Sequence, residues 1–332
     1  MLKVAIIGTG NIGKIHARCY QNNPQTELVA VCDMARDKAD AFAHQFGAKA
    51  YYNVEDLLKH EDLQAISVTT AGVENGSHHF EPTMQALEAR KAVLCEKPIS
   101  NDIEQARAMV AKAKAMQVPF GINLNHRFTP AADRLRQLQN DGELGDVLFI
   151  NMALWFNNPN EPTIWHHIRA LHPHSIDVMR YFGGDIKRVQ CFMEKAPGRQ
   201  KMWSTFSLNM QFASGAVGHL TGSMDMSWNH PIERCEVGGS KGRGIIENVY
   251  QRLEWMPRDK PEKMVLENGI MGGMSHFDDT FTRRINKFIE QVEAGEPLDA
   301  SGAEGLAAQE VIEAAIRSHE NGTVEEVPQI TK

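Results

Sequence analysis

Short apolar runs alternate with helical patterns over roughly the first third of the chain. Five such runs, rich in β-branched residues, lie at Lys3–Ile7, Glu27–Cys32, Ala65–Thr69, Ala92–Cys95 and Pro119–Leu124. Runs of this kind are typical of parallel strands that are covered on both faces. Between them, apolar residues recur three or four positions apart, as at Phe80, Met84 and Leu87, which predicts amphipathic helices. The alternation predicts right-handed crossovers and a doubly wound α/β sheet.

The pattern changes in the second half, where apolar and polar residues alternate. Thr205–Phe212 alternates strictly, and after the turn at 213–215 the pattern resumes through Leu220 and Met224. This predicts an antiparallel hairpin with one buried face. Further strands are predicted at Val147–Phe156, Val189–Glu194, Arg234–Gly238 and Gly244–Val249, and a late helix carries Phe277, Phe281, Ile285, Phe288 and Val292. The second half is therefore expected to be α+β with a mostly antiparallel sheet.

Composition and charge narrow the classes of function. The chain has 332 residues, 42% of them hydrophobic and 23% charged. At about 100–200 residues per domain we expect two domains, 1–122 and 123–332, and a disordered chain is excluded. With a net charge of −7, the chain lacks the excess of basic residues that is typical of a nucleic-acid binder. No apolar run reaches the length of a membrane-spanning helix. We expect no targeting peptide, and the five cysteines, which lack CxxC spacing, predict buried thiols in a cytoplasmic protein.

A glycine-rich turn is the first chemical motif, with the sequence Gly8-Thr9-Gly10-Asn11-Ile12-Gly13 directly after the first predicted strand. Gly8 permits a tight turn, Gly10 lets a pyrophosphate approach the backbone, and Gly13 lets helix and strand pack closely. The helix that follows offers N–H groups and a partial positive charge to phosphates. Asp33, 20 residues beyond Gly13, can accept hydrogen bonds from a ribose, which favours NAD. Arg36 lies close to Asp33 in the sequence and could accept the 2′-phosphate of NADP, so NADP stays open as the alternative.

The second motif is Cys95-Glu96-Lys97-Pro98, at the carboxyl end of a later predicted strand. Ligands of open α/β sheets bind at this edge. A lysine beside the nicotinamide can hydrogen-bond a substrate hydroxyl and stabilise the alkoxide that forms as hydride leaves. On composition alone, however, a lysine at the end of a strand is more often a solvated surface charge.

Taken together, the glycine-rich turn, Asp33 and Glu96-Lys97-Pro98 resemble the glucose–fructose oxidoreductase/inositol dehydrogenase/MocA (Gfo/Idh/MocA) family, over nearly the whole chain. Further segments that fit the family are His79, which lies 17 residues before Glu96, Asn125–Phe128 followed by Pro130, Gly142–Gly145 and Ser301–His319. The resemblance implies an N-terminal Rossmann domain and an NAD(P)-dependent oxidoreductase of carbohydrate metabolism that acts on sugars, inositols or related polyols. It also implies that an open sheet in the second domain forms a homodimer or homotetramer.

The resemblance pairs the lysine with a histidine of an HxxD element, matched here by His174-Ser175-Ile176-Asp177. Pro173 suits the first turn of a helix, and the helix dipole there disfavours a protonated imidazole, which suits a neutral base. Lys97 and His174 are therefore the expected catalytic residues, with His174 taking the hydroxyl proton. The residues expected to bind the cofactor are Gly8, Gly10, Asn11, Ile12, Gly13, Asp33, Thr70, His79, Glu96 and Lys97. Those expected to bind substrate are Lys97, Asn125, Arg127, Trp165, His174 and Asp177.

Two departures from the family pattern bear on the substrate. The family's DxxxHxxD element has an aspartate four residues before the histidine, where this chain has Ala170. A glycine-rich loop before that position is also missing, so Arg169 or His172 is expected to occupy part of the aspartate's space. The loop at 70–77 is longer than usual, with Ala71 where the family often has proline. Both changes leave the cofactor assignment intact.

Other interpretations of the same residues remain open. A non-catalytic protein that senses a dinucleotide would keep the glycine-rich turn and discard the chemistry, and an NAD-assisted glycosidase would oxidise its sugar only transiently. The histidines at 166, 167, 172 and 174 could bind zinc, but the chain has no HExxH or CxxC motif, and we expect no metal. The aromatic residues Trp155, Phe156, Trp165 and Trp228 could form a wall on which a sugar stacks, although core packing explains them at least as well.

Overall fold

The computed structural model describes residues 1–226, 232–249, 251–267 and 277–330. By its internal contacts the chain divides into two compact units, a first unit of Met1–Leu124 with Phe281–Leu306 and a second unit of Asn125–Thr280 with Ala307–Thr331. Our expectation had assigned everything from residue 123 onward to the second domain, whereas residues 281–306 pack with the first unit. Trp228 lies outside the described residues. Within the ranges given above, no helix is both long and apolar enough to cross a bilayer.

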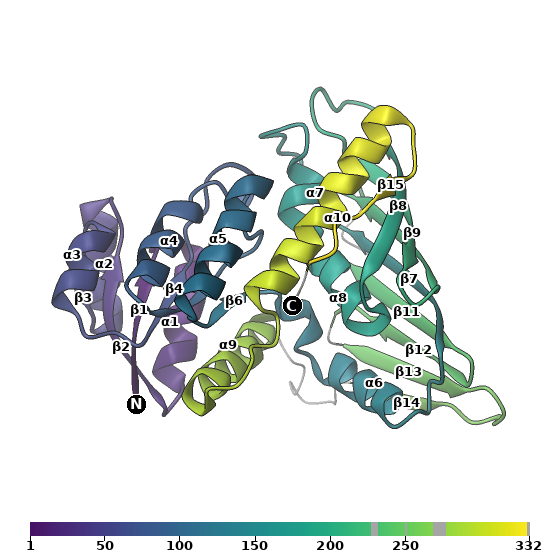
Figure 1. Ribbon diagram of the computed structural model, residues 1–332, viewed down its shortest axis with the longest axis horizontal. Helices are drawn as coiled ribbons and strands as arrows, with labels where there is room; N and C mark the ends of the chain where they lie inside the picture. The colour runs from purple at the N-terminus through teal and green to yellow at the C-terminus, as the bar shows by residue number, and fades with distance from the viewer. Residues whose placement is uncertain (227–231, 250, 268–276, 331–332) are drawn as a thin grey trace. The chain divides into compact units, whose positions relative to one another are not determined.

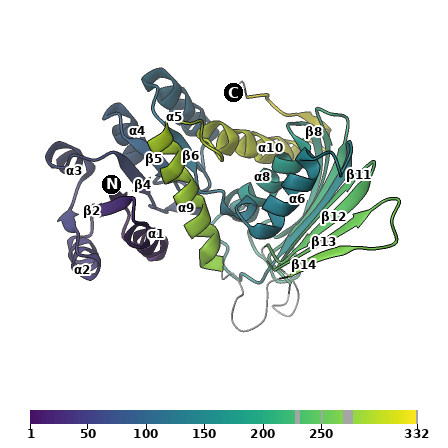
Figure 2. The same ribbon diagram turned by 90° about the horizontal axis from the view of Figure 1, so that it is seen from below.

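The first unit is a parallel sheet with helices on both faces (Figures 1 and 2). Its elements before residue 125 are β1 Leu2–Ile7, α1 Asn11–Asn22, β2 Thr26–Cys32, α2 Arg36–Phe46, β3 Lys49–Tyr51, α3 Val54–His60, β4 Ala65–Val68, η1 Val73–Asn75, α4 Phe80–Glu88, β5 Ala92–Cys95, α5 Ile103–Met116 and β6 Phe120–Ile122. The strand order is β3-β2-β1-β4-β5-β6 and every pairing is parallel. This is the Rossmann order, so the doubly wound prediction is confirmed. The three-residue strand β3 was not predicted, because it is too short to carry a period.

Helix α9 (Phe277–Ala294) explains why the first unit includes a late segment of the chain. Its residues Phe281, Ile285 and Phe288 are buried in one core with residues of β1 and β2. Between them on the helix, the fully buried Arg284 donates hydrogen bonds to the carbonyl oxygens of Ile122 and Ala300, at 3.1 and 3.2 Å. The predicted late helix is thus confirmed, and its apolar stripe supplies one wall of the nucleotide-type core.

The second unit is built around a mixed sheet. Its further elements are η2 Asn125–Arg127, α6 Pro130–Asn140, β7 Val147–Trp155, α7 His166–Leu171, α8 Pro173–Gly183, β8 Ile186–Glu194, β9 Thr205–Phe212, β10 Val217–Ser223, β11 Glu233–Gly239, β12 Gly242–Glu247, β13 Arg252–Pro257, β14 Met264–Glu267, α10 Gly302–Asn321 and β15 Glu325–Glu326. Within the described residues the order is β14-β13-β12-β11-β7-β10-β9-β8-β15. Strands β7 and β10 pair in parallel and all the other pairings are antiparallel, which confirms the prediction of a mostly antiparallel sheet.

One face of this sheet is covered by α6, α8 and the C-terminal part of α10 (Figure 2). The predicted hairpin is confirmed as β9 and β10, and Phe206, Leu208, Met210 and Phe212 all face the covered core. Neighbouring residues of a strand point to opposite faces. The other face of the sheet therefore carries the exposed side chains of Phe192 and Val217.

Truncating Leu208 to alanine is expected to reduce the free energy of unfolding by about 3 kcal/mol, because it leaves a cavity in a fully buried layer. The matched control is Leu148→Ala on β7, whose side chain is 53% exposed and should cost less than about 0.5 kcal/mol. Equilibrium unfolding in urea measures both changes. Equal losses in the two variants would contradict the assignment of the buried face.

Candidate functional site

The three glycines of the turn between β1 and α1 have different physical roles. Gly8 has φ +102°, and a Cβ there would lie 2.6 Å from the backbone nitrogen of Thr70. At Gly13 a Cβ would collide with the carbonyl oxygen of Gly8, which explains the close packing of helix against strand. At Gly10, by contrast, a Cβ would meet nothing within 4 Å. Gly8 and Gly13 are thus required by packing, whereas Gly10 leaves its side of the turn open to a ligand.

The start of α1 fits a dinucleotide pyrophosphate. Gly10 is the N-cap and supplies no side-chain hydrogen bond, and the first turn, which includes Asn11 and Ile12, carries no acidic residue. First-turn N–H groups have no partner within their own helix and bring a partial positive charge with them. Together with the open space at Gly10, this end of the helix is suited to a bound phosphate anion.

Asp33 follows β2 and is oriented by the glycine-rich turn. Its Oδ2 accepts hydrogen bonds from the backbone nitrogen and the hydroxyl of Thr9, at 3.0 and 2.8 Å, and its Oδ1 accepts one from the nitrogen of Ala35 at 3.0 Å. Burial alone would raise the pKa of the Asp33 carboxyl, but these hydrogen bonds hold it below its usual range. An ionised carboxylate at this position suits a ribose diol and repels a 2′-phosphate. Nearby, the Arg36 guanidinium stacks over the Tyr52 ring at 4.2 Å.

His79 joins the two loops that follow β4 and β5. Its Nδ1 lies 2.7 Å from the carbonyl oxygen of Pro98, and its Nε2 lies 2.6 Å from that of Thr70. The Thr70 hydroxyl donates a hydrogen bond to the carbonyl oxygen of His78. Burial lowers the pKa of His79, although the two carbonyl contacts oppose that shift. In the structure both ring nitrogens of His79 contact backbone carbonyl oxygens. Cofactor binding by Thr70 and His79 stays a prediction.

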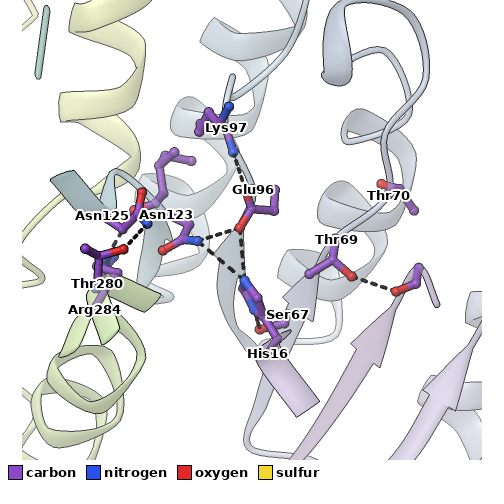
Figure 3. A network of polar contacts seen from close by, with 12 residues as sticks. His16, Ser67, Thr69, Thr70, Glu96, Lys97, Asn123, Asn125, Thr280 and Arg284 are labelled. Atoms are coloured by element: carbon purple, nitrogen blue, oxygen red, sulfur yellow. Dashed lines mark hydrogen bonds and ion pairs between the residues drawn. The ribbon is translucent and has the colours of Figure 1, made fainter. Parts of the chain in front are cut away.

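A buried polar network surrounds Glu96 at the end of β5 (Figure 3). The Oε1 atom of Glu96 contacts His16 Nε2 at 2.9 Å and also accepts a hydrogen bond from the side-chain amide of Asn123. On its other side, His16 Nδ1 lies 3.0 Å from the Ser67 hydroxyl. Oε2 of Glu96 accepts a hydrogen bond from the backbone nitrogen of Lys97 at 3.3 Å. Helix α1 and strands β4 and β5 therefore all help to hold the segment that carries Lys97.

The charges of Glu96 and Lys97 are coupled. Burial would raise the pKa of the Glu96 carboxyl, but hydrogen bonding to His16 and the nearby positive charges hold it below its usual range. Burial lowers the pKa of the Lys97 ammonium, and the negative charge of Glu96 opposes this shift. Lys97 is therefore a half-buried amine that gives up its proton more readily than a surface lysine does.

In the second unit, His174 and Asp177 lie in the first turns of α8, which begins at Pro173 and is followed by Gly184 with φ +81°, as predicted. Asp177 forms a buried bidentate ion pair with Arg127, at 2.8 Å to Nε and 2.6 Å to Nη2. Such a planar fork is geometrically selective. It holds the start of α8 against η2, the short helix that contains Arg127.

Sequence reasoning did not identify two residues near His174, namely His126, which stacks on it, and Glu233, which contacts His126. The ring of His126 is stacked on the ring of His174, with centroids 3.8 Å apart and planes 6° apart. On its other side His126 Nδ1 lies 2.7 Å from Oε2 of Glu233 on β11. The position of His126 next to Arg127 was the available signal, whereas nothing in the local pattern of β11 singles out Glu233.

The other expected residues have well-defined surroundings. Ala170 is buried, and its neighbour Arg169 forms a bidentate ion pair with Glu313 on α10. His172 contacts His167 Nε2 at 2.9 Å and the Ser175 hydroxyl at 3.1 Å, and burial lowers the pKa of His167 to about 3. In the described part of the chain, no three His, Cys, Asp or Glu side chains gather as metal ligands would.

Asn125 and Trp165 complete the residues expected at the substrate. The side-chain amide nitrogen of Asn125 donates to the Thr280 hydroxyl at 2.5 Å (Figure 3). The Asn125 Oδ1 atom is buried and has no hydrogen-bond partner among the described residues, so it can accept a ligand hydroxyl. Trp165 is half-buried at the start of α7, and its ring packs edge-on against His319.

Known proteins match both halves of the chain. Residues 2–124 match the model of an oxidoreductase family with an NAD-binding Rossmann fold, and residues 132–244 match the GFO/IDH/MocA C-terminal domain. Inositol 2-dehydrogenase of Rhizobium meliloti (strain 1021) is 27% identical over 329 residues, covering 96% of each chain. D-glucoside 3-dehydrogenase of Escherichia coli (strain K12) is 35% identical over 358 aligned positions, covering 97% of this chain and 96% of that one.

Solved structures agree with this match in fold. The structure of levoglucosan dehydrogenase in complex with NADH superposes with a TM-score of 0.89 at 20% identity, covering 99% of this chain and 100% of that one. The glycine-rich turn, Asp33 and the Glu96-Lys97-Pro98 segment all lie within residues 2–124, the part of the chain that the NAD-binding model matches. On this combined evidence, the chain belongs to the Gfo/Idh/MocA family of oxidoreductases, enzymes with an NAD-binding Rossmann fold that act on CH–OH donors.

Proposed function

We propose that this protein is an NAD-dependent dehydrogenase that oxidises a secondary hydroxyl of a sugar, inositol or related polyol, with Lys97 and His174 as the proton-transfer pair. The observation that carries the proposal is the buried Glu96 network, which holds Lys97 at the carboxyl end of β5. Open α/β sheets bind their ligands at that edge. Burying a carboxylate among three polar partners is energetically costly, which is unusual for a segment without a function.

In the proposed reaction Lys97 binds the reacting oxygen. Its ammonium donates a hydrogen bond to the substrate hydroxyl and stabilises the negative charge that develops on that oxygen as the C–H bond breaks. Because burial lowers the pKa of Lys97, the amine can also exchange this proton with the substrate oxygen more readily than a surface lysine would. When bound, NAD supplies the acceptor for the hydride.

His174 takes the hydroxyl proton as the O–H bond breaks and the carbonyl forms. Its position in the first turn of α8 favours a neutral imidazole, which a base must be. The ion pair of Arg127 and Asp177 keeps that turn in place. The unpaired Oδ1 of Asn125 accepts a hydrogen bond from a second hydroxyl, and Trp165 offers an aromatic face to the ring of the substrate.

The names of the relatives support the substrate class. One is an inositol 2-dehydrogenase and another a D-glucoside 3-dehydrogenase, and each name describes oxidation of a hydroxyl-bearing carbon of a polyol. We propose the same class for this chain. The exposed apolar side chains of Phe192 and Val217 support assembly of a homodimer or homotetramer through the uncovered face of the sheet. The five cysteines are buried thiols that form no disulfide, which supports a cytoplasmic location.

A second candidate function is supported by one observation. Ala170 is apolar and buried where the family pattern has an acidic residue, so His174 lacks that neighbour. A protein that senses a dinucleotide without turning over a substrate would tolerate this loss. Tight NAD binding by the wild-type protein, with no turnover across a broad panel of sugars and inositols, would favour the sensor. Release of a glycosidic leaving group without net NADH would instead indicate an NAD-assisted glycosidase.

Replacing Lys97 with methionine is expected to lower kcat by about 10²–10⁴-fold while the affinity for NAD is retained, because the change removes proton transfer and keeps the glycine-rich turn. Absorbance of the reduced nicotinamide measures turnover over the substrate panel, and calorimetric titration measures NAD binding. Lys114→Met, an exposed lysine on α5, is the control. Unchanged turnover in Lys97→Met would refute the proposed chemistry.

Replacing Glu96 with glutamine is expected to move the alkaline limb of the pH profile of kcat/KM to lower pH. The sign follows from the coupling described above, because the negative charge of Glu96 raises the pKa of the Lys97 ammonium, and its removal lets that pKa fall further. The protonated fraction of Lys97 is then lost at a lower pH. The exposed Glu104→Gln is the control. A limb that stays in place or moves to higher pH would show that Lys97 does not determine it.

Replacing Asp33 with alanine is expected to weaken NAD binding by about tenfold or more, because hydrogen bonds to a charged group are worth about 1.5–3 kcal/mol. The preference for NAD over NADP should shrink, since the 2′-phosphate no longer meets a negative charge. Dissociation constants for both cofactors measure this change, with the exposed Asp37→Ala as the control.

If Arg36→Gln weakens NADP binding and spares NAD, then Arg36 is the group that accepts the 2′-phosphate.

A further inference from the structure

His174 is in contact with a second imidazole. The ring of His126 lies parallel to it, with centroids 3.8 Å apart and planes only 6° apart, and both residues are buried. A parallel contact at this distance restricts rotation of each ring, because any turn about χ2 drives ring atoms into the neighbouring face. The plane of His174 is therefore coupled to the plane of His126.

His126 is itself held from two further elements. Its Nδ1–H donates to Oε2 of Glu233 on β11 at 2.7 Å, and both side chains are buried. The ring of Phe277, at the start of α9, meets it edge-on at 5.8 Å and 90°. Rotation of His126 would leave the Glu233 carboxylate buried without its partner, which is a costly state. These contacts make His126 a rigid platform for the ring stacked on it.

Arg169, His172 and Asp177, on the same helical segment as His174, each have a partner of their own. Arg169 pairs with Glu313, His172 contacts His167 and Ser175, and Asp177 pairs with Arg127. Position 170 is alanine and has no polar atom in its side chain. Arg169 and Asp177 are thus held in ion pairs, and the ring of His126 is stacked on His174 with a geometry that bears directly on its orientation.

We propose that His126, held by Glu233, is a positioning residue that sets the ring plane of His174 for proton transfer. The proposal rests on the function proposed above, since it assigns a role to the same base. His126 touches no reacting atom in this scheme and acts only through the ring of His174. A misoriented base transfers its proton more slowly without necessarily weakening the binding of substrate.

The test compares two side chains at position 126 in a common Glu233→Gln background, which removes the stranded carboxylate from both variants. His126→Phe keeps a flat ring to stack on His174, whereas His126→Ala removes it. The alanine variant is expected to lose about tenfold to hundredfold in kcat, with far smaller changes in KM and in NAD affinity. The phenylalanine variant is expected to recover most of kcat. Equal kcat in the two variants would overturn the proposal.

A spectroscopic readout separates this inference from the proposed function. In ¹³C-histidine-labelled protein, the ring protons of His174, assigned with His174→Gln, should resonate upfield because a stacked ring shields them. The shift should disappear with alanine at position 126 and persist with phenylalanine. The control His219→Gln alters a histidine on β10 that contacts Asn209 and Thr221, and should leave the signal unchanged.

The kcat measurements and the NMR shift together distinguish failure of the proposed function from failure of the positioning role. If no polyol is turned over but the ring-current shift behaves as described, the proposed function fails and the stacked geometry stands. If turnover is normal and kcat is insensitive to position 126, the proposed function stands and the positioning role is overturned. An unshifted His174 signal in the wild-type protein would refute the stack itself.

Discussion

The buried carboxylate of Glu96 is the constraint on which the first unit's functional chemistry depends. A carboxylate removed from water is stable only when its oxygens are satisfied, and here His16, Asn123 and the backbone of Lys97 satisfy them. These partners come from α1, from the segment after β6 and from the end of β5. The same contacts that stabilise the charge therefore also join the helix of the glycine-rich turn to the lysine segment. A change at any one of them is expected to disturb both the position of Lys97 and its pKa.

In the second unit, an ion pair and a pair of stacked rings hold the segment that carries His174. Arg127 and Asp177 form a forked ion pair within the core, and the stacked rings of His126 and His174 lie on residues adjacent to that pair. His126 and Arg127 are neighbours on η2. They thus contact His174 and Asp177, which lie about one turn apart on α8. Because each contact is directional and buried, the start of α8 has little freedom to rotate. In this way a short 3-10 helix determines the orientation of the proposed base.

The family pattern and this chain differ most clearly around position 170. An acidic residue there would give His174 a hydrogen-bonding neighbour, whereas the buried side chain of Ala170 has no polar atom that could do so. Arg169, which with His172 is expected to occupy part of that space, forms a bidentate ion pair with Glu313 on α10. The longer loop at 70–77 is connected to the lysine segment through His79, whose ring contacts the backbone of both Thr70 and Pro98. Substrate selection in this family member is therefore expected to differ from that of relatives with the usual pattern.

The sequence by itself determined the parallel sheet, the hairpin of β9 and β10, the glycine-rich turn and the lysine and histidine motifs. Each of these depends on local periodicity or on residues at fixed short spacing, which a single chain displays directly. Only the tertiary structure assigned residues 281–306 to the first unit and brought Glu233 to His126 and His16 to Glu96. Those pairs are 107 and 80 residues apart along the chain. No local pattern encodes such contacts, because they arise from strand order and from how helices pack on the sheets.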